Sequence, residues 1–177
     1  MRNPRLLRDA RKRVRHTELR IITVNLPQEF SSDLPLDRAQ RNAYGVFPPD
    51  LNPDERRMAD VLDGHALVRW WHRNPSRKPG VSVALYGWDD GDGFFPDFVV
   101  GMDQREAPGG IALLEVKGQQ LLAVDKEPAK AEAVHPDYGR VFMAGRRRGE
   151  TEFMMLHKDG DKLDSDGPFA LERLRWV

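Results

Sequence analysis

The chain has 177 residues, with 28 Lys and Arg against 28 Asp and Glu, five His and no Cys. That length suits one domain with at most a short appendage, and the missing Cys excludes disulfide scaffolds, thiolate metal sites and cysteine nucleophiles. Zero net charge argues against a histone-like nucleic-acid binder. No apolar run approaches the roughly 20 residues of a membrane span, so we expect a cytoplasmic protein.

The amino end is rich in arginine. Residues 4–16 have apolar positions at helical spacing and predict a basic amphipathic helix, and residues 18–26 are β-branched and predict a strand. Residues 27–52 contain four prolines and predict a connector. We therefore expect an appendage over residues 1–35 and a main domain over 36–177. The appendage is expected to be either the tail of a preceding motor domain or a docking segment, in a chain cut from a larger protein.

The main domain is expected to be α/β with a mixed sheet flanked by helices. Asn52, Pro53 and Glu55 are typical of a capping box that starts a helix, and Gly64 is typical of a helix end. Ile111 to Lys117 is apolar on both faces, which predicts a buried central strand. The other expected elements are strands over 68–72, 81–86, 94–102, 140–144 and 152–157, with 81–86 and 94–102 forming a hairpin, and helices over 126–134 and 168–176.

Three charged residues interrupt these apolar strands. Asp97 stands among apolar residues, and Glu115 and Lys117 share one face at the end of the central strand. Buried charges are costly unless they are paired or bind a metal, and two neighbouring carboxylates are hard ligands that suit Mg²⁺ or Mn²⁺. A structural interpretation stays open: Glu115 and Lys117 as an ion pair, and Asp97 as a backbone cap.

The pattern Pro96-Asp97 followed by Glu115-Val116-Lys117 resembles the signature of the PD-(D/E)XK nuclease superfamily, and the order of helices and strands resembles its restriction-endonuclease-like core. More narrowly, the chain resembles the carboxyl-terminal nuclease domain of type III restriction-like DEAD/DEAH helicases. The motifs that carry this resemblance are Arg41-Asn42-Ala43-Tyr44-Gly45, Trp70-Trp71-His72-Arg73-Asn74, Pro96-Asp97-Phe98-Val99-Val100 and Leu113-Leu114-Glu115-Val116-Lys117-Gly118.

The resemblance implies Mg²⁺- or Mn²⁺-dependent hydrolysis of DNA, within a helicase–nuclease or restriction system. It implies that Asp97, Glu115 and the Val116 carbonyl bind the metal, and that Lys117 orients water and stabilises charge on phosphorus. Many members also use an acid from the first core helix, for which Glu55 is the position chosen here. Its role in the capping box is an equally good alternative, and Asp60 and Asp63 are less attractive candidates. The implied partners are DNA and a helicase or ATPase domain.

Two further expectations concern residues around this constellation. One of Trp70 and Trp71 is expected in the core because neighbouring strand residues point to opposite faces. The cluster Arg146-Arg147-Arg148 is a candidate phosphate-facing surface or ordinary solvated charge. The rival hypothesis for the whole chain is a catalytically silent nuclease fold that binds nucleic acid or a partner protein.

Overall fold

The computed structural model describes residues 28–29, 31–78, 81–85, 94–103, 110–118, 134–135, 138–147, 149–159 and 162–175. By contacts between residues, the chain divides into two units, Met1–Leu26 with Pro75–Phe95, and Pro27–Asn74 with Pro96–Val177. Three predicted elements lie wholly or mostly outside the described residues: the helix over 4–16, the strand over 18–26 and most of the helix over 126–134. The predicted boundary at residue 35 stays a prediction.

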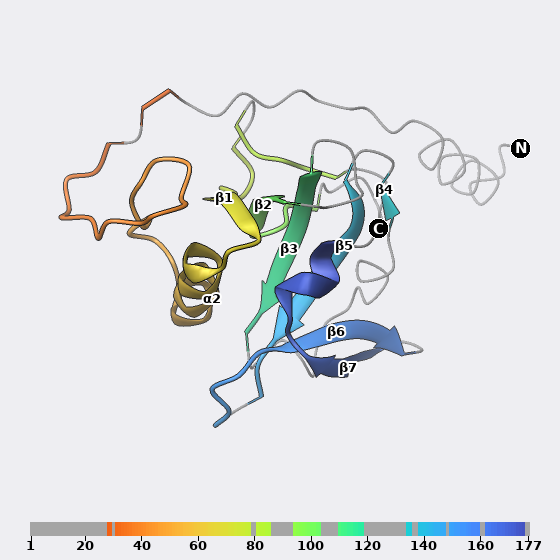
Figure 1. The fold of residues 1–177 in the computed structure, drawn as a ribbon. Helices are drawn as coiled ribbons and strands as arrows, with labels where there is room; N and C mark the ends of the chain where they lie inside the picture. Colours follow the sequence, from red (N-terminus) through yellow and green to blue (C-terminus); the bar gives the residue numbers. More distant parts are fainter. Residues whose placement is uncertain are drawn as a thin grey trace, which may run out of the picture. The chain divides into compact units, whose positions relative to one another are not determined.

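The second unit is an α/β structure built on a mixed sheet (Figure 1). The strands are paired in the order β1-β2-β3-β5-β6-β7, and β4 pairs with β5. All pairs are antiparallel except β3 with β5, which is parallel. The elements are α2 (Pro53–Gly64), β1 (Val68–Arg73), β2 (Phe98–Met102), β3 (Ile111–Lys117), β4 (Val134–His135), β5 (Gly139–Gly145), β6 (Met154–Asp159), β7 (Lys162–Pro168) and the 3-10 helix η3 (Leu171–Arg175).

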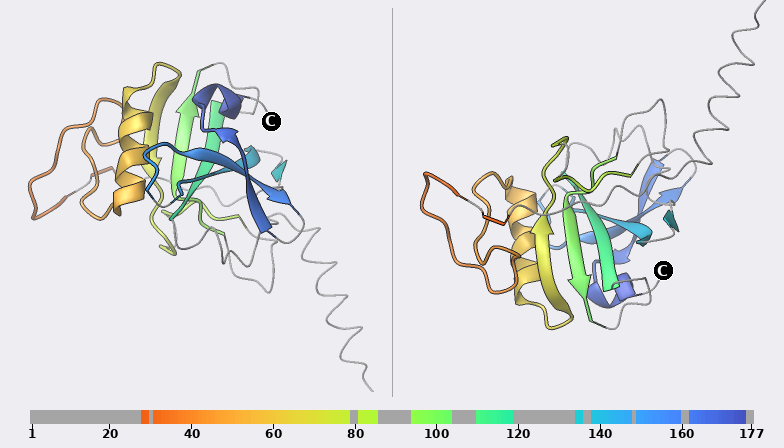
Figure 2. Two further views of the ribbon diagram at one scale, coloured as in Figure 1. Left: turned by 90° about the horizontal axis from the view of Figure 1, so that it is seen from below. Right: turned by 90° about the horizontal axis from the view of Figure 1, so that it is seen from above.

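Helix α2 begins as the sequence predicts. The Asn52 side chain accepts hydrogen bonds from the N–H groups of Asp54 and Glu55, and the Glu55 carboxylate accepts from the Asn52 N–H at 3.0 Å. This capping box satisfies helix N–H groups that have no partner inside the helix. The helix lies beside the sheet (Figure 2) and contacts β1 and β3. Its buried Met58, Ala59 and Leu62 belong to the main core.

The sheet has two faces that differ in character. The helix face carries Trp71, Val100, Ala112, Leu114 and Phe142, which form the main core with α2 and η3. The far face carries the residues between them, because strand side chains alternate. Val99, Leu113 and Met143 of the far face are also buried, so both faces of β3 are covered near its middle, as predicted for a central strand.

The predicted hairpin of residues 81–86 with 94–102 is confirmed only in part, and residues 86–93 lie outside the described part of the chain. In the first unit, described over 75–78, 81–85 and 94–95, only one isolated bridge joins Leu85 to Phe94. Strand β2 instead has β1 and β3 as its two neighbours, so both its edges are already hydrogen-bonded. The pairing of β1 with β2 joins segments far apart in the sequence, which local patterns do not reveal.

The carboxyl-terminal part contains a second difference from expectation. Strands β6 and β7 form a hairpin in which Asp159 pairs with Lys162, although β7 has no alternating apolar pattern. The expected helix over 168–176 is the shorter 3-10 helix η3, whose Leu171 and Leu174 are buried. Among the described residues, none of the helices combines the length and apolarity needed to cross a bilayer.

Gly101 on β2 allows close packing of the Trp70 indole. A Cβ at this position would lie 2.3 Å from Trp70 Nε1, so we expect Gly101→Ala to displace the indole and lower the free energy of unfolding by about 1–3 kcal/mol. Gly64→Ala is the matched control, because a Cβ there meets nothing within 4 Å and helix propensity favours Ala. Urea denaturation of both variants checks the prediction, and equal stability of the two would contradict it.

Candidate active site

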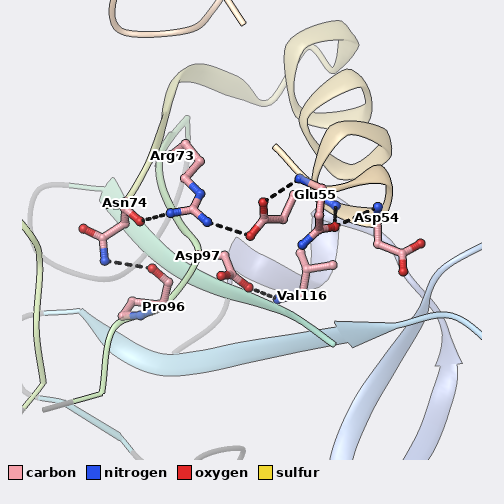
Figure 3. A network of polar contacts seen from close by, with 8 residues as sticks. Asp54, Glu55, Arg73, Asn74, Pro96, Asp97 and Val116 are labelled. Atoms are coloured by element: carbon pink, nitrogen blue, oxygen red, sulfur yellow. Dashed lines mark hydrogen bonds and ion pairs between the residues drawn. The ribbon is translucent and has the colours of Figure 1, made fainter. Parts of the chain in front are cut away.

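The candidate site lies where β2 and β3 separate. The last pair of their ladder is Phe98 with Leu114, and Pro96 has no N–H group with which to extend it. The side chain of Asp97 replaces the next hydrogen bond between the strands, because its Oδ2 accepts from the Val116 N–H at 2.7 Å (Figure 3). This arrangement sets Asp97 next to the end of β3, where Glu115 and Lys117 also lie.

Asp97 is in a strongly perturbed environment. Burial and the negative charge of Glu115 raise its pKa to about 8, with Glu55 adding to the shift. The hydrogen bond from Val116 and the positive charge of Arg73 lower the pKa but only in part. A carboxyl group that resists ionisation beside a second carboxylate is a group that a divalent cation would help to ionise. The donor set therefore fits Mg²⁺ or Mn²⁺ by its chemistry.

Glu115 and Lys117 form an ion pair on the far face of β3. The distance from Lys117 Nζ to Glu115 Oε1 is 3.0 Å, and their side chains are only 9% and 14% exposed respectively. Both contacts foreseen by the structural interpretation are thus present: this ion pair and the Asp97 cap on Val116. The two contacts involve neighbouring residues of β3, and the ammonium group of Lys117 lies at the Glu115 carboxylate.

Glu55 approaches the same region from the first turn of α2. One of its oxygens accepts from the Asn52 N–H, and the other accepts from Arg73 Nη2 at 2.8 Å. The side chain is almost fully buried, at 6% exposure. Glu55 is therefore engaged in the capping box and an ion pair, and it acts on Asp97 through its charge.

Asp60 and Asp63 of α2 have partners outside this region. Asp60 is exposed and pairs with Arg56 at 3.2 Å. Asp63 accepts hydrogen bonds from the N–H groups of Gln40 and Arg41 and from Trp71 Nε1. The bonds from Gln40 and Arg41 hold residues 40–41 against α2, and the bond from Trp71 joins α2 to β1, so Asp63 has a structural role.

Arg73 and Asn74 connect the parts of the site, a role that the sequence did not predict. Arg73 bridges Glu55 and the Asn74 carbonyl, with both hydrogen bonds at 2.8 Å (Figure 3). Asn74 donates from its N–H to the Asp97 carbonyl and from its side chain to the Pro96 carbonyl. A charged residue and an amide directly after a buried strand were the available signal in the sequence.

His72 and the tryptophans belong to the packing around this region. His72 is buried at 8% exposure, its ring contacts Tyr44 edge-on, and burial followed by the charge of Arg73 lowers its pKa to about 4. Trp71 is fully buried in the main core, as expected for one of the pair, and Trp70 is partly exposed. His72 is therefore neutral at physiological pH.

The basic cluster separates into different environments. Arg146 binds Asp54 of α2 through two nitrogens, at 2.6 and 3.1 Å, and donates to the Glu150 carbonyl. Arg147 is exposed, and Arg148 lies outside the described residues. Arg146 therefore serves as a structural link between β5 and α2.

Within the described part of the chain, no group of three or more His, Cys, Asp and Glu side chains is placed to hold a metal ion. The predicted ligands are two carboxylates, Asp97 and Glu115, with the Val116 carbonyl, which is a smaller set that includes a backbone oxygen. Comparison of the chain with models of known families, with curated proteins and with solved structures finds no match. The chemistry of the site therefore rests on its own residues.

Proposed function

We propose that this protein is a metal-dependent deoxyribonuclease with a restriction-endonuclease-like core. The observation that carries the proposal is the meeting of Asp97, Glu115 and Lys117 where two central strands separate. The element order α2, β1, β2, β3 and then β5 parallel to β3 supports it, because the resemblance implies a helix, three strands and a further strand after a crossover.

Asp97 and Glu115 would hold the cation together with the Val116 carbonyl. When bound, Mg²⁺ or Mn²⁺ would supply a water of lowered pKa and neutralise a phosphate oxygen. Lys117 would orient that water and stabilise the negative charge that develops on phosphorus. Its ion pair with Glu115 holds the ammonium group at this position before substrate arrives.

Glu55 remains the predicted acid of the first core helix. Both of its carboxylate oxygens accept hydrogen bonds, one from Asn52 and one from Arg73. These bonds fix the negative charge beside Asp97 and support a positioning role rather than direct binding of the metal. Arg73 carries that restraint on to Asn74 and thereby to the backbone of Asp97.

A second candidate function is a catalytically silent nuclease fold that binds nucleic acid or a partner protein. The observation that favours it is that Asp97, Glu115 and Glu55 each have a partner from the protein itself. The two functions differ in cation binding and in cleavage. For either one, the proposed partners are DNA and a helicase or ATPase domain in the cytoplasm.

Replacing Lys117 by Gln tests the nuclease proposal. We expect wild-type protein to cleave plasmid or single-stranded DNA in Mg²⁺ or Mn²⁺, and Lys117→Gln to lose activity by about 100-fold or more, as for removal of one charge-stabilising donor. Calorimetry should still show Mn²⁺ binding to the variant, because its carboxylates remain.

Lys78→Gln is the matched control, since Lys78 is exposed in the first unit. A folded wild-type protein that binds Mn²⁺ neither by calorimetry nor in the presence of DNA, and cleaves nothing, would refute the nuclease and leave the binding function. Equal cleavage by wild type and Lys117→Gln would refute the role of Lys117.

A further inference from the structure

A pocket of about 210 Å³ lies on the strands next to the candidate site. It is formed by the end of β5 and by β6 and β7, all within the second unit. Its lining residues are Gly145, Arg147, Met154, Leu156, Leu163, Asp164 and Ser165. Nothing in the proposed chemistry at Asp97 and Glu115 uses this pocket.

The strand register places the pocket on the same face of the sheet as Lys117. Gly145 is the partner of Lys117 in the parallel pair β3–β5, so their backbones are about 4.8 Å apart. Gly145 pairs with Met154 across β5–β6, and Leu156 pairs with Ser165 across β6–β7. Paired residues share a face, so this row continues the far face away from the site.

The neighbouring residues confirm this assignment of faces. Arg146 turns to the helix face, where it binds Asp54 of α2, whereas Arg147 lines the pocket. Met155 likewise belongs to the main core on the helix face. The basic cluster therefore contributes one structural arginine to the helix and one exposed arginine to the pocket.

The chemistry of the pocket suits a nucleobase. Met154, Leu156 and Leu163 supply apolar contact for a flat ring, and Ser165 supplies a hydroxyl for its polar edge. Asp164 adds a carboxylate, one oxygen of which already accepts a hydrogen bond from the Ser165 N–H. Arg147 at the rim supplies a cation for a backbone phosphate. The volume is below the about 300–1,000 Å³ of sites for drug-sized ligands, which fits a single base rather than a larger molecule.

We propose that this pocket holds a base of the DNA strand being cleaved, next to the scissile phosphate, and so selects the nucleotide at the cut. This inference rests on the proposed nuclease function. Lys117 is one strand away from Gly145, so a strand whose phosphate lies at Lys117 brings an adjacent base to β5 and β6. Single-stranded or locally unpaired DNA is the substrate form that offers such a base.

Filling the pocket with Ser165→Trp tests the inference. The matched control is Thr151→Trp, which puts the same side chain into a different pocket of about 430 Å³, lined by Thr151, Val61 and Phe169 among others. With single-stranded oligonucleotides and Mn²⁺, we expect Ser165→Trp to raise KM about tenfold or more. We expect kcat to stay nearly unchanged and the base preference next to the cut to disappear, while Thr151→Trp behaves as wild type.

A second measurement separates failure of the pocket from failure of the nuclease. In EDTA, titration of the four deoxynucleoside 5′-monophosphates followed by NMR should show binding to wild type and Thr151→Trp, and lost binding to Ser165→Trp. Arg147→Gln is the second variant to use if Ser165→Trp does not fold. Because Arg147 is exposed, its replacement should leave the fold intact and weaken the same nucleotide binding. Unchanged KM and base preference in the filled variant overturn the inference, as does absence of nucleotide binding in wild type. Nucleotide binding by a wild-type protein that neither binds Mn²⁺ nor cleaves DNA supports the pocket and refutes the nuclease.

Discussion

Replacing Asp97 by Asn is expected to stabilise the protein at pH 8 and to abolish DNA cleavage. The two effects have one cause, because the native fold holds this carboxyl where burial and Glu115 disfavour its charge. Asn keeps the acceptor for the Val116 N–H and removes the charge. In the proposed function Asp97 holds the metal, so its loss should reduce cleavage by at least about 100-fold, the scale of removing one electrostatic contribution to a transition state.

The pH dependence of stability gives the sign of this effect. The pKa of Asp97 in the folded protein is about 8, above its ordinary value, so the folded state holds a proton that the unfolded chain releases above about pH 4. Wild-type stability therefore falls as pH rises from about 4 to 8, and Asp97→Asn escapes that loss. Each pKa unit corresponds to about 1.4 kcal/mol. At pH 8 the free energy of unfolding of Asp97→Asn should therefore exceed that of wild type by more than about 2 kcal/mol.

Thermal melts without divalent cation at pH 5 and pH 8, paired with cleavage assays, check this prediction. Asp103→Asn is the control, because Asp103 is exposed and pairs with Arg69 at the surface. A variant that is less stable than wild type at pH 8 would contradict the charge argument. Cleavage retained by Asp97→Asn would contradict its place in the site.

Replacing Asp63 by Ala is expected to destabilise the fold by about 3–5 kcal/mol, since it leaves buried donors without an acceptor. Asp63 accepts from Gln40, Arg41 and the Trp71 indole, at 2.8, 2.8 and 2.9 Å. These bonds hold residues 40–43 along the outer edge of β1, where Arg41 and Ala43 exchange backbone hydrogen bonds with Trp71. Covering this edge also protects it from pairing with other chains.

Asp60→Ala is the matched control on the same helix, because its exposed pair with Arg56 contributes at most about 1 kcal/mol. Urea denaturation measures both variants. Burial raises the pKa of Asp63, but the three hydrogen bonds and the charge of Arg41 together lower it overall. The stability that its charge supplies is therefore present above about pH 4 and is lost as pH falls below that. The stability difference between wild type and Asp63→Asn should accordingly narrow in acid, and a constant difference would contradict this mechanism.

Local features of this fold could be predicted from the sequence because their causes are local. The capping box at Asn52 and Glu55 depends on residues three apart, and the structure confirms it. The burial of β3 on both faces follows from its continuous apolar run and is also confirmed. The meeting of Asp97 with Glu115 could be foreseen from adjacent strands joined by one turn.

Other features could not be predicted, because their partners are distant in the chain. Arg73 and Glu55 are separated by 18 residues, and Arg146 and Asp54 by 92. Strand β7 has polar residues and a glycine where a strand pattern would need apolar ones, and it exists because β6 offers an edge for pairing. The pocket beside Lys117 needs that hairpin.

The sequence by itself therefore determined the α/β class, the start of α2 and the central strand. It also singled out Asp97, Glu115 and Lys117 as the candidate site. Only the tertiary structure decided which strand lies beside β2, that Glu55 is bound by Arg73, and that β5, β6 and β7 extend the face of Lys117 into a pocket. The physical reason is that periodicity and capping act over a few residues, whereas strand order and buried ion pairs are set by packing between distant segments.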